Sequence, residues 1–173
     1  MSNVFYYFAY GSNLLRSRLQ ASCKTAEYQC VAKLKSYSLI FVDGGWNNTG
    51  WHGAAATLTP NDNDSVYGVV WKCHIDERPI LTRQEQSYDC ITVSVEPVGD
   101  EKHLEVITYM LPDNLRGYIS LPSPQYLSVV LKGAKQMKLP KDYIQRLEKL
   151  QHNGYSGEIH ISGFDYEAEI ADA

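Results

Sequence analysis

Hydrophobic residues follow a strand pattern in the first two-thirds of the chain and a helical pattern near its end. Val4–Tyr10 is dense in β-branched and aromatic side chains, which is typical of a buried strand. Tyr28–Phe41 has the same character, with a bend near Ser36 and Tyr37. The same criteria predict four further strands, at Ala54–Leu58, Val66–Cys73, Tyr88–Val98 and His103–Leu111.

The segments between these strands are polar and rich in turn-forming residues. Pro60–Ser65 predicts a turn that joins two strands, and the segment Gly99–Glu101 predicts a hairpin. Gly68 lies inside a strand pattern, which indicates a close backbone approach or a bulge. Asp43–Gly53 is a long, glycine-rich loop with two tryptophans. It suits a binding loop as well as a surface loop that covers the edge of a barrel.

Helical spacing predicts four helices, over residues 14–19, 76–84 and 124–138 and from residue 140 onward. Asn13, Asp76 and Ser123 precede the first three of them and are expected to be their N-caps. Pro124 then occupies a first helical position, where its missing N–H is tolerated. These helices lie at the start, the middle and the end of the strand-rich region.

The order of these elements indicates the fold class. The chain lacks a regular alternation of strands and helices, which argues against a doubly wound parallel sheet. We therefore expect an α+β fold, in which helices flank a small mixed or closed sheet. A length of 173 residues fits one domain, which we place at residues 1–157. Residues 158–173 form an acidic tail without Lys or Arg, in which Phe164 and Tyr166 are candidate docking residues.

Charge and composition exclude several classes of partner. A formal net charge of −4 gives no electrostatic reason to expect nucleic acid or an anionic membrane. There is no apolar run of the roughly 20 residues that a membrane span needs, and no signal peptide pattern, so we expect a cytoplasmic protein. Cysteine and histidine spacings match no zinc site, and we expect no metal. The four cysteines are Cys23, Cys30, Cys73 and Cys90.

Two positions could carry chemistry. The predicted strand breaks at Gly11 into a turn whose backbone N–H groups could face a carboxylate or an oxyanion, although an ordinary strand–turn–helix corner has the same shape. Glu85 ends the predicted second helix, where unpaired carbonyl groups and partial burial would raise the pKa of a carboxyl. A solvated glutamate at a helix end fits this position equally well. Ser12 lacks the surroundings of a serine nucleophile, and Cys90 has no basic neighbour.

Five stretches resemble the signatures of one known family. They are YFAYGSNL (Tyr7–Leu14), WHGAAATL (Trp51–Leu58), VYGVVWK (Val66–Lys72), LTRQE (Leu81–Glu85) and PSPQYLSVVLKGAKQMKLPKDYIQRL (Pro122–Leu147). Together they are similar to the γ-glutamylcyclotransferases over nearly the whole chain except the tail. The branches of the superfamily that act on glutathione or on γ-glutamylamines have different sequence motifs in the first strand.

The resemblance implies a small β-barrel with helices packed around it, often as a homodimer. It implies conversion of L-γ-glutamyl-amino acids into 5-oxoproline and a free amino acid, without a cofactor. The family's catalytic glutamate falls on Glu85. The residues that the resemblance assigns to substrate binding are Tyr7, Phe8, Ala9, Tyr10, Gly11, Ser12, Asn13, Tyr88 and Tyr126.

The chain departs from the family pattern after Glu85. Only Gln86, Ser87 and Tyr88 precede the next strand, a shorter segment than in vertebrate members, and Gln86 replaces a usual glycine. Substrate preference could differ for this reason. Two alternatives therefore remain open: a cyclotransferase that acts on glutathione or γ-glutamylamines, and a non-catalytic protein that binds γ-glutamyl peptides.

Overall fold

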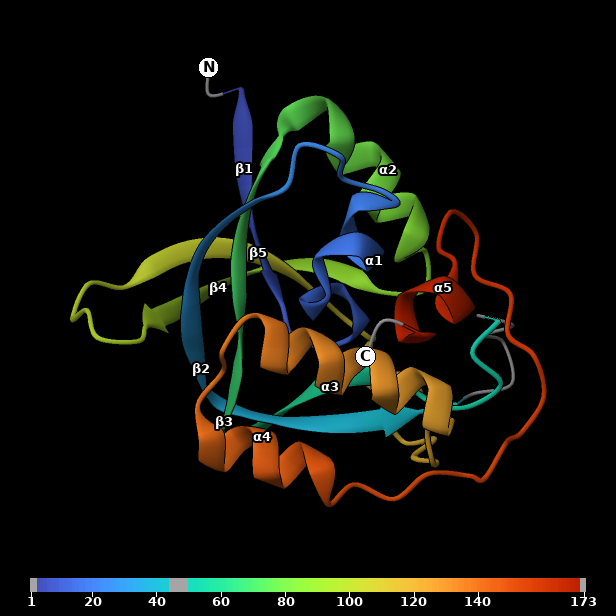
Figure 1. Cartoon of the computed structure of the whole chain (residues 1–173). Coiled ribbons are helices and arrows are strands. Elements are labelled where there is room, and N and C mark those ends of the chain that lie inside the picture. Colours follow the sequence, from blue (N-terminus) through green and yellow to red (C-terminus); the bar gives the residue numbers. More distant parts are fainter. Residues whose placement is uncertain (1–2, 44–49, 172–173) are drawn as a thin grey trace.

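Five strands form a closed barrel in the computed structural model, which describes residues 3–43 and 50–171 (Figure 1). Around the barrel the strand order is β1-β3-β2-β4-β5. The strands are β1 (Val4–Ala9), β2 (Glu27–Val42), β3 (Ala55–His74), β4 (Asp89–Pro97) and β5 (Leu104–Met110). The expected α+β fold with a small mixed barrel is confirmed.

The barrel is closed by a parallel contact in an otherwise antiparallel sheet. β1 pairs with β3 in antiparallel register from Val4–His74 to Ala9–Val69. On its other side β1 meets β5 in parallel, through Tyr7 and Ile107. The pairing between β1 and β5 is limited to this position, and the Thr108 hydroxyl donates to the Phe8 carbonyl at 2.8 Å next to it.

The expected turn at Pro60–Ser65 is wrong. These residues belong to the 20-residue strand β3, which runs beside β2 along its whole length. The polar residues are accommodated as a bulge, since the register shifts between the pairs Lys35–Ser65 and Tyr37–Pro60. Ser36 in the opposite strand has a φ of 63°. The predicted bend near Ser36 is confirmed, and it is a bulge of the strand pair rather than a chain reversal.

Five α-helices and three short 3-10 turns are present in the described residues. The helices are α1 (Arg16–Gln20), α2 (Arg78–Gln84), α3 (Pro124–Gln136), α4 (Lys141–Glu148) and α5 (Tyr166–Ala171). The 3-10 turns are η1 (Ser12–Leu14), η2 (Ile75–Glu77) and η3 (Asp113–Leu115). In the view of Figure 1, the tip of the β4–β5 hairpin points away from α1, α2 and α5.

One of the three predicted N-caps is confirmed. The Ser123 hydroxyl accepts a hydrogen bond from the Tyr126 N–H at 3.1 Å, at the start of α3. Asn13 caps no helix, because the chain first makes the turn η1 and α1 begins after Leu15. Asp76 is also not a cap, since the His74 side chain accepts from the Asp76 N–H at 3.3 Å. The Asn13 side chain has other partners, described below.

Two glycines allow the close packing that positions the first turn. A Cβ at Gly68 would lie 2.3 Å from the Ala9 carbonyl oxygen, so the predicted close approach of β3 to β1 is confirmed. A Cβ at Gly133 would lie 2.4 Å from the Leu15 nitrogen, so α3 rests directly on the chain after η1. Side chains larger than hydrogen at either position would push the first turn away from its place.

The C-terminal segment packs onto the domain through its aromatic residues. The Phe164 ring lies 6.3 Å from that of Trp51, and the Tyr166 hydroxyl lies 3.1 Å from the Ser128 Oγ. Trp51 itself is buried, whereas Trp46, the other tryptophan of the glycine-rich loop, lies outside the described residues. Both candidate docking residues of the tail therefore make contacts with the rest of the chain.

Candidate active site

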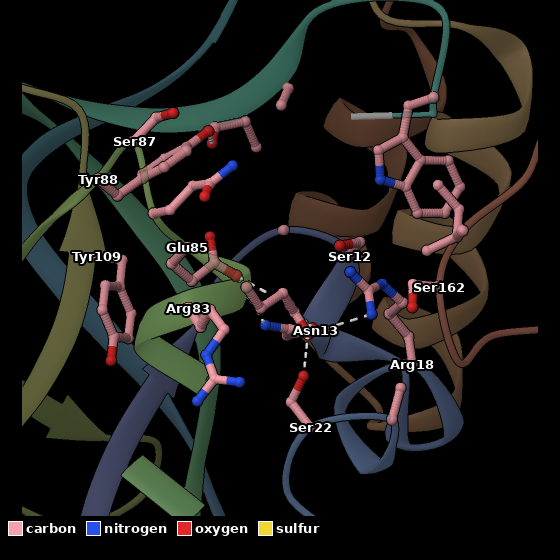
Figure 2. A pocket seen from close by; sticks show the side chains of 18 of the residues that line it. Ser12, Asn13, Arg18, Ser22, Arg83, Glu85, Ser87, Tyr88, Tyr109 and Ser162 are labelled. Atoms are coloured by element: carbon pink, nitrogen blue, oxygen red, sulfur yellow. Dashed lines mark hydrogen bonds between the residues drawn. The ribbon is translucent and has the colours of Figure 1, made fainter. Parts of the chain in front are cut away.

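A cavity of about 480 Å³ opens beside the first turn of the chain. Its wall combines residues from many parts of the sequence, among them the turn at residues 10–13, Arg18 of helix α1, the end of α2 with residues 85–88, Tyr126 of α3 and residues 161–163 of the tail. Figure 2 shows Glu85, Ser87 and Tyr88 on one side of this pocket and Ser12, Arg18 and Ser162 on the other, with Asn13 between them.

Most of the predicted site residues meet in this pocket. Those that line it are Tyr7, Tyr10, Gly11, Ser12, Asn13, Glu85, Tyr88 and Tyr126. Phe8 and Ala9 do not line it, and both side chains are fully buried in the core. Successive residues of a strand point to opposite faces, so Tyr7 and Phe8 cannot both face the same cavity.

Glu85 is the acidic residue of the pocket, and two amides hold one of its oxygens. It is partly buried at the C-terminal end of α2. Its Oε1 accepts from Asn13 Nδ2 at 3.3 Å and from Gln84 Nε2 at 3.0 Å. Neither of these bonds involves Oε2, which leaves that oxygen for a ligand or a proton. The carboxyl group therefore has a fixed orientation and one free side.

The surroundings of Glu85 raise the pKa of its carboxyl above the usual value. Loss of solvent is the largest cause and favours the neutral form. The hydrogen bonds from Gln84 and Asn13 and the positive charge of Arg18 act in the opposite direction and offset part of the effect. A carboxylate of increased basicity is a suitable proton acceptor.

Asn13 and Gln84 form a small network that links three elements. Asn13 Nδ2 also donates to the Tyr7 hydroxyl at 3.1 Å, and Gln84 Nε2 donates to Asn13 Oδ1 at 3.2 Å. The Gln84 Oε1 accepts from Arg18 Nη1 at 3.2 Å and from the Ser22 hydroxyl. Because Asn13 serves this network, its side chain is not available to cap α1.

Tyr126 reaches the pocket from the first turn of α3, with its hydroxyl beside Gly11. That oxygen accepts from the Ala56 N–H at 3.1 Å. Burial is the main reason why the pKa of Tyr126 rises to about 12, so the hydroxyl keeps its proton at neutral pH. A phenol oxygen that already accepts a hydrogen bond can direct its own proton at a ligand.

Tyr88 also lines the pocket despite the short segment after Glu85. Its N–H donates to the Glu85 carbonyl at 2.8 Å, which makes a tight turn, and its hydroxyl donates to the Ala56 carbonyl at 2.8 Å. Burial raises the pKa of Tyr88 well above its usual value. The aromatic ring is thus a fixed part of the wall next to Glu85.

Arg18, Gln84 and the tail residues Ile161–Gly163 are among the wall residues that sequence reasoning missed. A signal for Arg18 exists in the sequence. Leu15, Arg18, Leu19 and Ser22 have the i, i+3, i+4, i+7 spacing of a buried helix face, and a charge within such a face indicates a special environment. The contribution of the tail has no such local signal.

Residues 3–43 and 50–171 contain neither a candidate metal-binding cluster nor a helix that could span a membrane. No group of three or more His, Cys, Asp or Glu side chains in these ranges could hold a metal ion. Over the same ranges, no helix has the length and apolar character needed to cross a membrane.

Comparisons with known proteins agree with the resemblance in the sequence. The model of the AIG2-like family matches residues 65–147. The human γ-glutamylcyclotransferase is 35% identical over 160 residues, which cover 90% of this chain and 83% of the human protein. The mouse γ-glutamylcyclotransferase is also 35% identical, covering 90% of this chain and 84% of its own. A solved structure of a γ-glutamyl cyclotransferase superposes with a TM-score of 0.89 at 32% identity, covering 98% of this chain and 99% of that one.

Proposed function

The chain belongs to the γ-glutamylcyclotransferase family, and we propose that its pocket converts L-γ-glutamyl-amino acids into 5-oxoproline with Glu85 as the general base. The observation that carries this assignment of Glu85 is its geometry. One carboxylate oxygen is fixed by two amides, and the other is left for the substrate. The pocket also has the size expected of a site for a small molecule.

The reaction is an intramolecular aminolysis. The α-amine of the substrate attacks its own γ-carbonyl carbon, forming a five-membered ring and a tetrahedral oxyanion. This intermediate collapses with cleavage of the original amide bond, and the released amino acid takes up a proton. Because nucleophile and electrophile belong to the same molecule, effective molarities of about 10⁵ M or more are attainable once the substrate is folded correctly.

Glu85 supplies the proton transfers of this sequence. As a carboxylate it takes a proton from the α-ammonium group, which frees the lone pair for attack. As a carboxylic acid it returns that proton to the nitrogen of the departing amino acid. A pKa raised by burial suits both roles, since it narrows the gap between the basicity of the carboxylate and that of the amine.

The Tyr126 hydroxyl and the turn at Gly11–Asn13 provide for the oxyanion. The hydroxyl is held beside Gly11 by the N–H group of Ala56. Its proton is then available to the oxygen of the tetrahedral intermediate. Removal of one such donor costs about 3 kcal/mol in comparable sites.

Tyr7, Tyr10, Ser12, Asn13 and Tyr88 complete the substrate site in this proposal. Asn13 and Tyr88 border Glu85 on two sides, through the amide contact and through the tight turn. The resemblance also assigned Phe8 and Ala9 to substrate binding, but neither residue lines the pocket. We assign them the supporting role of core residues behind the turn.

Residues 1–157 are proposed as the catalytic domain, with residues 158–173 as an appended acidic tail. A cytoplasmic location and a homodimer also belong to the proposal, on the strength of the family resemblance. Light scattering of the purified protein tests the dimer directly, because a mass near 19.6 kDa means a monomer.

The decisive assay incubates the protein with L-γ-glutamyl-L-alanine and measures 5-oxoproline and free alanine. Wild type is expected to release both in equal amounts, and Glu85→Gln less than a hundredth as fast, given the 10²–10⁴-fold effect of a general base. Glu105→Gln, on the exposed side of β5, is the matched control and should behave as wild type. Appreciable turnover by Glu85→Gln contradicts the role of Glu85.

The same assay separates the alternatives. Faster turnover of glutathione or γ-glutamyl-lysine than of γ-glutamyl-alanine would indicate the specificity of the branches that act on glutathione or on γ-glutamylamines. Binding of the dipeptide without release of 5-oxoproline would favour the non-catalytic binding protein, with the short segment Gln86–Tyr88 as the suspected cause.

A further inference from the structure

Arg18 is a buried cation in the wall of the pocket. Its side chain is almost completely buried, with 6% of the residue surface exposed. Arginine is rarely buried to this extent unless an anion accompanies it. Within the part of the chain that the structure describes, no carboxylate lies within ion-pair distance of this guanidinium, and its Nε has no hydrogen-bond partner. The group therefore has no anion in direct contact, although the charge of Glu85 acts on it across Gln84.

The contacts of Arg18 hold it in place without neutralising it. Nη1 donates to the neutral Gln84 Oε1 at 3.2 Å, and the guanidinium carbon lies 6.0 Å from the centre of the Phe164 ring. An amide oxygen and an aromatic face fix the direction of the side chain but form no ion pair with it. In Figure 2, Arg18 lies beside Ser12 and Ser162 at the pocket wall, across from Tyr88.

The distance from Arg18 to Glu85 is bridged by one side chain. The Gln84 amide binds Arg18 through its oxygen and Glu85 through its nitrogen. A positive and a negative group thus lie one amide apart, on the two sides of the pocket. An α-amino acid group carries the opposite pair, a carboxylate and an ammonium attached to the same carbon.

We propose that Arg18 binds the α-carboxylate of the γ-glutamyl group and thereby directs the α-amine toward Glu85. This inference rests on the proposed function and specifies the substrate further: the γ-glutamyl group must carry a free α-carboxylate. The guanidinium fork suits a planar carboxylate, and Ser12 and Ser162 lie on the same side of the pocket. Arg18 is a binding and specificity residue, whereas the proton transfers belong to Glu85.

The test compares two ligands that differ only in this group. Calorimetry measures binding of 5-oxo-L-proline and of its carboxamide, 5-oxo-L-prolinamide, to wild type and to Arg18→Met. Wild type should bind the carboxylate at least about 30-fold more tightly, since removal of one partner from a buried charge pair typically has that effect or more. Arg18→Met should lose this discrimination while binding the carboxamide about as well as wild type does.

Two variants guard against a purely structural explanation. Arg16→Met changes an exposed arginine on the same helix and should keep the wild-type ratio. Arg18→Lys keeps the charge but not the fork, and an intermediate ratio is expected. The proposal is overturned if wild type fails to prefer the carboxylate, including the case in which it binds neither ligand, or if Arg18→Met retains the wild-type ratio.

Turnover gives an independent readout. L-γ-glutamyl-L-alanine and the analogue with an α-carboxamide on the glutamyl group should differ in kcat/KM for wild type and become nearly equal for Arg18→Met. Failure of the proposed function appears as absence of 5-oxoproline release by wild type. The binding ratio measured by calorimetry requires no turnover, so the two failures are distinguishable.

Discussion

The Nδ2 of Asn13 lies 3.3 Å from the Oε1 of Glu85, although the two residues are 72 positions apart in the sequence. The contact joins the turn after β1 to the C-terminal end of α2. It brings the backbone that would face an oxyanion to the carboxylate that would move protons. The same Asn13 amide donates to the Tyr7 hydroxyl at 3.1 Å. One side chain therefore sets the positions of the Glu85 carboxylate and the Tyr7 hydroxyl.

The pH dependence of kcat/KM should reflect this contact. Glu85 acts as a base only when ionised, and burial raises the pKa of its carboxyl, so activity should fall on acidification at a higher pH than an ordinary glutamate would give. The Asn13 hydrogen bond stabilises the carboxylate. Asn13→Ala should therefore move this acidic limb to still higher pH. Asn61→Ala, on the exposed bulge of β3, should leave it unchanged, and an unshifted limb in Asn13→Ala would contradict the role of the contact.

Glu85→Gln should make the folded protein more stable at neutral pH. The pKa of Glu85 is higher in the folded than in the unfolded chain, so the folded state is penalised as pH rises from the unfolded to the folded value, and the penalty stays constant above both. The variant lacks this penalty. Its Tm should exceed that of wild type at pH 7.5, and the difference should disappear near pH 4, where Glu85 is protonated in both states. Thermal unfolding followed by circular dichroism at the two pH values tests this prediction. An equal increase in Tm at both pH values would mean that the ionisation of Glu85 is not the cause.

Tyr126→Phe should reduce kcat by about 10²–10³-fold with a much smaller effect on KM, because an oxyanion donor acts in the transition state. The ring packs against Trp51 at 5.2 Å between centroids and should stay in place. Steady-state kinetics with γ-glutamyl-alanine provides the measurement. Tyr28→Phe, at a partly exposed position on the barrel, is the control. A variant that changes only KM would make Tyr126 a binding residue.

Gly11→Ala should lower kcat by disturbing the same hydroxyl. The added Cβ would lie 3.0 Å from the Tyr126 Oη and 3.3 Å from the Ala56 Cβ, so the tyrosine must move. A shift of a few tenths of an ångström relieves the contact. Displacements of about 1 Å at a reacting centre can cost 10²-fold in rate, so a smaller loss is expected here. Gly117→Ala, which meets nothing within 4 Å, should have wild-type kinetics. Normal activity of Gly11→Ala would exclude the proposed function of this turn.

Local patterns predicted the elements well where the sequence signal and the packing agree. The β-branched run of β1, the serine–proline start of α3 and the β4–β5 hairpin all have strong local signatures, and each forms as expected. Pro60–Ser65 has an equally strong turn signature. However, β3 pairs with β2 both before and after this segment, so the chain continues as one strand with a bulge. The polar residues are accommodated in the bulge. The sequence of β3 alone does not show this bulge, because it depends on the pairing with β2.

The site was predictable only where its residues lie in recognisable motifs. Glu85 and the turn at Gly11–Asn13 have such motifs, and they do line one pocket. Arg18 and Gln84 have their roles through contacts with each other and with Ser22, which come from two separate helices. The assignment of Asn13 as a cap was wrong for the same reason, since its amide is used in a distant contact. Contacts between separate elements determine such roles, and a single sequence does not display them.

The parallel contact between Tyr7 of β1 and Ile107 of β5, which closes the barrel, has a consequence for folding during synthesis on the ribosome. The first strand synthesised needs a partner from the second half of the chain, and the pocket needs residues 161–163 as well. No incomplete nascent chain can therefore contain the finished pocket. Contacts between such distant residues also slow folding. The protein should gain its activity only after residues 161–163 have left the ribosome.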